Sequence, residues 1–96
     1  MSTIKDSKKD QIANRRAKIV SLRAQMTRKK EEKSKRMASL ASSIKSTSSP
    51  SSKENYRKTK LTEAARFERE IDSIKRQIEQ EQKYLEIDRK SLAAMK

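Results

Sequence analysis

The sequence contains no cysteine, histidine, glycine or tryptophan, and its only proline is Pro50. Without cysteine and histidine, a disulfide framework, a Cys/His zinc site, a thiol nucleophile and a Ser-His-Asp triad are excluded. Without glycine, the phosphate-binding loops of P-loop and Rossmann folds lack the residue that their tight turns need. We therefore expect a protein that is not an enzyme and that uses no metal, cofactor or small-molecule substrate.

Apolar residues are also scarce, because they make up 31% of the 96 residues and aromatic residues only 3%. A soluble globular domain usually has about 45–50% apolar residues, so a compact core is out of reach at this length. No apolar run approaches the roughly 20 residues of a membrane-spanning helix, and the first ten residues lack the apolar segment of a secretory signal. The composition leaves long helices or disorder, and we predict an all-α protein of long helices. We expect it in the cytoplasm, with export that needs no signal as the alternative.

Charged residues make up 41% of the chain, and the net charge is +13, of which residues 1–50 carry +10 and residues 51–96 carry +3. Such a field favours nucleic acid, an anionic membrane or an acidic protein, and the alternative is a well-solvated helical surface. The densest basic segment, residues 27–36, contains no apolar residue. Its cations should point outward, because Glu31 and Glu32 cannot neutralise them all in a core; Lys33, with its stem over Ala64, is the exception we allow. The candidate polyanion-binding residues are Arg28, Lys29, Lys30, Lys33, Lys35 and Arg36.

The second half of the chain shows an apolar heptad pattern that no glycine or proline interrupts between Ser52 and Lys96. One apolar row recurs every seven residues and a second row follows it by three, which is the a and d spacing of a coiled coil. Acidic residues, Glu81 and Asp88, occupy two positions of the second row. We predict a helix over residues 52–96 whose interface residues are Ala64, Phe67, Ile71, Ile74, Ile78, Leu85, Leu92 and Met95.

The first half has a less regular version of the same pattern. Its apolar positions recur every seven residues up to Met26, and the next apolar position, Met37, follows eleven residues later. Eleven residues is the length of a stutter in a heptad repeat. After an N-terminal tail of residues 1–6, we predict one helix over residues 7–44, starting at Ser7 with Asp10 as its capping partner. Its predicted interface residues are Ile12, Ile19, Leu22, Met26, Met37 and Leu40.

A serine-rich turn, predicted over residues 45–51, separates the two helices. Pro50 cannot continue a helix, and Ser51 followed by Glu54 resembles a capping box. The turn is short enough to fold the helices back on each other as an αα-hairpin; the alternative is a flexible linker between splayed helices.

The numbering of the apolar rows predicts how the two helices face each other. Ile19 with Ile78 and Met26 with Ile71 share one midpoint, between Ser48 and Ser49. The pair Ile12 and Leu85 has the same midpoint. This register places Arg16 opposite Glu81 and Lys9 opposite Asp88. The alternative is a register shifted by three or four residues. We therefore expect an antiparallel coiled-coil hairpin. Since each helix buries one stripe only, we also expect dimerisation into a four-helix bundle or docking on a partner, through the off-seam residues Ile4, Val20, Tyr56, Tyr84 and Ile87.

The order of a basic helix, a Ser/Thr-rich turn over residues 39–53 and an Arg/Glu-rich heptad helix is similar to a known arrangement. It resembles the N-terminal coiled-coil segments that precede TIR-like or CHAT-type domains in some bacterial signalling and defence proteins. Those segments share a Lys-x-x-x-Arg motif after the turn, here Lys53 and Arg57. The resemblance implies an assembly module whose effector domain lies elsewhere. A second resemblance is to the small helical hairpins of the Trp-x-Gly secretion family, although the tryptophan and glycine are missing here.

These observations predict a coiled-coil module that mediates protein–protein association, either with itself as a homo-oligomer or with a protein partner. The alternative is a basic helical module that binds nucleic acid or another polyanion. A third interpretation is a small helical-hairpin secretion partner or chaperone.

Overall fold

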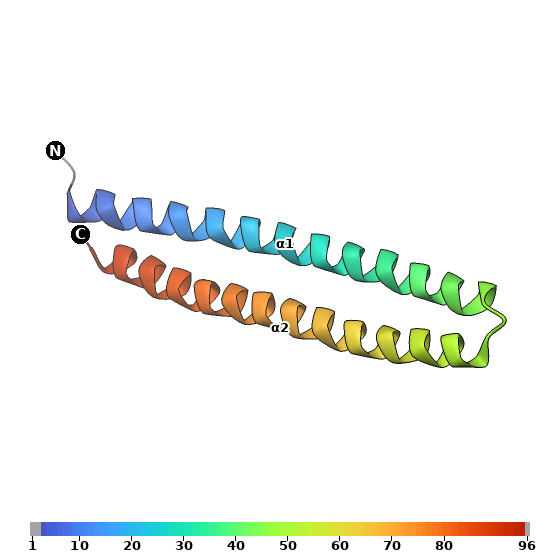
Figure 1. Cartoon of the computed structure of the whole chain (residues 1–96). Helices are drawn as coiled ribbons and strands as arrows, with labels where there is room; N and C mark the ends of the chain where they lie inside the picture. The colour runs from blue at the N-terminus through green and yellow to red at the C-terminus, as the bar shows by residue number, and fades with distance from the viewer. Residues whose placement is uncertain (1–2, 96) are drawn as a thin grey trace. The chain divides into compact units, whose positions relative to one another are not determined.

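The structure is a computed structural model that describes residues 3–95. It contains two α-helices, α1 (Ile4–Ser46) and α2 (Pro50–Ala94), and no strand among the described residues (Figure 1). Lysine, arginine, glutamate, glutamine and alanine dominate both helices, and all five are good helix formers. The predicted all-α fold with a single break is confirmed.

The turn between the helices is shorter than predicted and spans residues 47–49. The Ser49 hydroxyl accepts a hydrogen bond from the Ser52 backbone N–H (3.4 Å), so Ser49, rather than the predicted Ser51, caps α2. Pro50 then becomes the first helical residue, where its missing N–H costs nothing and its fixed φ suits the helix. The proline that prevents one continuous helix therefore also starts the second one.

Helix α1 begins at Ile4 and not at the predicted Ser7. The Thr3 hydroxyl accepts a hydrogen bond from the Asp6 N–H (3.0 Å), and the Asp6 carboxylate accepts one from the Thr3 N–H (3.4 Å). This reciprocal pair is a capping box, which satisfies two backbone donors at the helix start. The same Ser/Thr-x-x-acid pattern occurs at both places in the sequence, and the earlier one is used. The first two residues of the predicted tail, and Lys96 of the predicted second helix, lie outside the described residues.

The chain divides into two compact units. Unit 1 combines the N-terminal part of α1, up to Gln25, with the part of α2 that starts at Ile74, and unit 2 is Met26–Ser73, which includes the turn. Within unit 1 the helices are antiparallel, because Lys8 pairs with Asp88 while Arg15 pairs with Glu81. Both pairs are centred on Ser48, which agrees with the predicted antiparallel hairpin.

The core of each unit is a single stripe of apolar side chains along the helix–helix contact. No described side chain is completely enclosed, as expected where only two helices pack. The buried apolar residues are Ile12, Ile19, Leu22, Ile74 and Ile78 in unit 1, and Leu40, Phe67 and Ile71 in unit 2.

In unit 2 the seam of α1 runs through the charged segment instead of stopping there. The half-buried residues are Met26, Lys29, Lys33 and Met37, at spacings of three, four and four residues. These spacings add up to eleven residues, which is the predicted stutter, and they keep these four residues on one face of α1. Two lysines therefore occupy positions that apolar residues take elsewhere.

Candidate functional site

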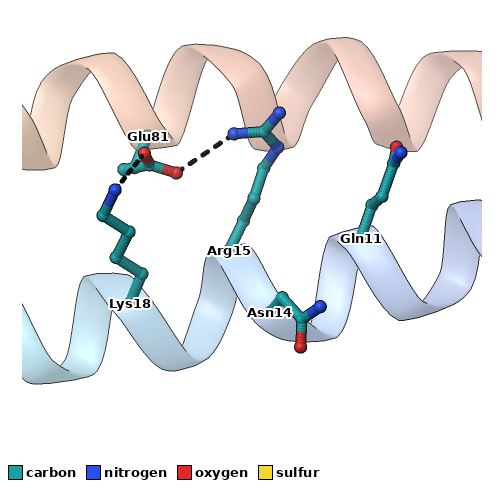
Figure 2. Close-up of a pocket in the computed structure, with 5 residues that line it drawn as sticks. All are labelled: Gln11, Asn14, Arg15, Lys18 and Glu81. Carbon is teal, nitrogen blue, oxygen red and sulfur yellow. Dashed lines mark hydrogen bonds and ion pairs between the residues drawn. The ribbon is translucent and has the colours of Figure 1, made fainter.

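One flank of unit 1 carries a network of ion pairs between the helices. Arg15 and Lys18 of α1 both reach Glu81 of α2, at 3.2 and 3.3 Å (Figure 2). Arg15 also donates a 2.6 Å hydrogen bond to Asp88, which Lys8 contacts at 3.3 Å. The carboxylate side chains are only 12% and 8% exposed, so the four pairs neutralise two acids that occupy core positions.

The pKa values reflect this pairing. The pKa of the Asp88 carboxyl lies below its ordinary value, chiefly because it accepts the hydrogen bond from Arg15, with Lys8 adding to the effect and burial opposing it. The pKa of Arg15 is raised, chiefly by the same hydrogen bond. Arg15 also lies 4.8 Å from the centre of the Tyr84 ring, which adds a cation–π contact. Asp88 therefore stays ionised while it is buried.

The basic partners of the two acids differ by one residue from the predicted ones. We expected Arg16 opposite Glu81 and Lys9 opposite Asp88, but Arg15 and Lys8 occupy these places. The reason is that Lys8 and Arg15 precede Leu22 by two and one heptads, so they belong to its row. The apolar pattern alone does not reveal Lys8 and Arg15, although their seven-residue spacing from Leu22 is readable in the sequence.

In unit 2, three of the six predicted polyanion-binding residues are bound to acids across the helix pair. Lys29 pairs with Glu70 at 3.1 Å, Lys33 with Glu68, and Arg36 with Glu63. These three cations support the helix pair and do not present free charge.

The expectation that every cation of this segment except Lys33 points outward is wrong for Lys29. Its side chain is half-buried, with 36% exposed. Its pKa is raised, first by the hydrogen bond to Glu70 and then by the charge of Glu32. In contrast, Arg28, Lys30 and Lys35 are exposed, and none of them forms an ion pair with any of residues 3–95.

Every predicted interface residue is buried or half-buried in the structure. Besides the eight buried residues named above, six are half-buried: Met26, Met37, Ala64, Leu85, Leu92 and Met95. The off-seam residues stay on the surface, with Ile4, Val20 and Ile87 each at least 60% exposed. Leu61, 74% exposed in unit 2, belongs to the same class but lies outside both heptad rows, so the heptad pattern does not reveal it.

The flank of unit 1 opposite the ion pairs forms a groove of a different kind, which we call the basic groove. Two adjoining hollows of about 360 and 340 Å³ share Arg16 and contain no acidic residue in their lining. Lys9, Arg16, Arg23 and Arg89 form the rim. The floor consists of Ile12, Ala13, Ile19, Val20, Leu85, Leu92 and Ala93, with Gln82 as the remaining polar residue.

No described group of carboxylates could hold a metal ion, and no described helix is long and apolar enough to cross a membrane. No family model matches the chain, and neither a curated protein nor a solved structure matches it. The resemblances noted in the sequence therefore stay expectations.

Proposed function

We propose that this protein is a non-enzymatic, cytoplasmic helical-hairpin module that mediates protein–protein association. The observation that carries the proposal is the set of large apolar side chains that the two helices leave exposed. Val20 and Ile87 in unit 1 and Leu61 in unit 2 are each at least 60% exposed. A two-helix core buries only one stripe of each helix, and a further helix packed on the hairpin would cover these side chains.

Sedimentation equilibrium and thermal unfolding over a concentration series test this proposal. If the chain associates with itself, its melting temperature rises with concentration, because assembly adds binding free energy to folding. If it associates with a different protein, it stays monomeric and melts at a low temperature on its own. A stable monomer with a high melting temperature at every concentration would show that the helix pair needs no further partner and would contradict the proposal.

Binding of a polyanion is the second candidate function, and the exposed, unpaired state of Arg28, Lys30 and Lys35 among residues 3–95 favours it. Replacing all three with glutamate should leave helicity nearly unchanged, because none of them takes part in the helix–helix contact. If this function holds, duplex DNA, RNA or anionic vesicles bind the parent protein, and the triple variant loses that binding at moderate salt. A parent protein that binds none of the three polyanions would rule this function out.

A further inference from the structure

We propose that the basic groove of unit 1 binds an acidic amphipathic helix of a partner protein. This inference rests on the proposed function and adds the surface and the chemistry of the partner. The occupant is a helix with apolar residues on one face and aspartate or glutamate on both borders of that face.

The rim of the groove is a regular row of cations along α1. Lys9, Arg16 and Arg23 are spaced seven residues apart. Each comes directly after a residue of the row that contains Leu22, so all three lie on the same side of the seam. Fourteen residues at the helical rise correspond to about 21 Å, the length of a four-turn ligand helix. Arg89 supplies a cation from α2.

The two flanks of unit 1 differ in how their charges are balanced. On the opposite flank, the three cations Lys8, Arg15 and Lys18 share two carboxylates of the same chain, Glu81 and Asp88. On the groove side, Lys9, Arg16 and Arg89 form no ion pair with any of residues 3–95. The lining of the groove contains no acidic residue, and acids on the borders of a partner helix would meet Lys9, Arg16 and Arg89 there.

The floor explains why the occupant is a helix and not nucleic acid or a membrane. Val20, 65% exposed, stands beside the half-buried Leu85, so apolar ligand side chains would gain contact there. Nucleic acid would leave this floor unused, and the lining offers no aromatic ring for base stacking. A membrane would contact an apolar face that stands out from the helix, whereas the apolar residues here line two hollows.

The charge of the rim also disfavours a second copy of this chain. A two-fold dimer across the groove would bring two copies of the same basic patch together, because such an interface uses the same surface on both subunits. Like charges in an interface act against the pairing. The acids that lie farther out on the same side of α2, Glu79 and Glu86, are outside the groove lining.

The test uses the full chain and a synthetic, fluorescently labelled helix of about 18 residues, with leucine at helical spacing on one face and glutamate along its borders. The control peptide carries lysine in place of every glutamate. Fluorescence anisotropy should show binding of the acidic peptide, and binding of the control peptide should be at least about tenfold weaker. Equal binding of the two peptides would overturn the proposal.

Two variants locate the binding site. Arg16→Glu, at the residue shared by both hollows, should weaken binding of the acidic peptide about tenfold, because an attraction becomes a repulsion. Arg28→Glu makes the same change of charge on exposed surface in unit 2 and should alter the affinity by less than about twofold. Circular dichroism of both variants checks that the helices remain. An equal loss in both variants would show a general effect of charge and would overturn the groove assignment.

The remaining outcomes separate this inference from the proposed function. If the acidic peptide binds, resists Arg16→Glu and is lost in Leu61→Asp, the association function stands and the groove assignment fails. If phosphatidylserine vesicles or duplex DNA bind in an Arg16-dependent manner while the acidic peptide does not, the groove is a polyanion site and the inference fails. If no peptide binds and the chain is a thermally stable monomer, the proposed function itself fails.

Discussion

Two neighbouring residues, Ile19 and Val20, provide a sharp test of the helix–helix contact in unit 1. Ile19 is 5% exposed in the seam, whereas Val20, the next residue along α1, is 65% exposed. Both are β-branched, and both are to be replaced with alanine. The two changes therefore remove similar chemistry from opposite environments.

The expected magnitudes follow from the burial. Truncation of a buried isoleucine to alanine costs about 2–5 kcal/mol, and the free energy of unfolding should fall by about 2–3 kcal/mol for Ile19→Ala, because a two-helix core lets solvent and neighbouring side chains fill part of the space. Val20→Ala should change it by less than about 0.5 kcal/mol, since surface substitutions are nearly neutral and alanine favours the helix. For a domain of this size, the larger loss corresponds to a fall of roughly 8–24 °C in melting temperature.

Urea unfolding followed by far-ultraviolet circular dichroism measures both changes. The midpoint should shift for Ile19→Ala while the slope stays the same, because the surface exposed on unfolding hardly changes. Equal losses in the two variants, or a larger loss for Val20→Ala, would mean that α1 presents a different face to α2. That result would refute the register on which the ion pairs and the basic groove both depend.

Three further predictions test other parts of the structure. Arg15 lowers the pKa of Asp88 in the folded chain, so Asp88 adds stability above its ordinary pKa of 3.8. This contribution is lost as the pH falls through the lower folded pKa. Urea midpoints over an acid pH series should therefore fall less in Asp88→Asn than in the parent protein. Cysteines at positions 19 and 78, in place of Ile19 and Ile78, should form a disulfide within one chain, and efficient bridging only between chains would indicate a swapped dimer. Ser49→Ala should lower the free energy of unfolding by about 1 kcal/mol through loss of the α2 cap, whereas Ser49→Gly should cost only a few tenths.

The elements of this fold were readable from the sequence, for reasons that particular residues make clear. Pro50 and the serines around it form the only helix-breaking segment, so the number of helices and the place of the turn followed directly. Ile19 and Ile78 share their midpoint with Met26 and Ile71, and this arithmetic indicated the antiparallel direction. The exact helix starts did not follow, because Thr3 and Ser7 both begin a Ser/Thr-x-x-acid pattern, and only the hydrogen bonds distinguish them.

The surface was less predictable, since the role of a cation depends on what lies across the seam. Lys29 and Lys30 are neighbours in one basic run, yet Lys29 is half-buried against Glu70 and Lys30 is exposed. Sequence periodicity places a residue on a face of its own helix, and this determined the apolar stripe of each helix, while the composition determined the net positive charge. Only the packing of α1 on α2 decided which charges meet, because an ion pair needs two side chains within a few ångströms. It thereby paired the cations of one flank of unit 1 with acids and left Arg16, on the other flank, beside an open apolar groove.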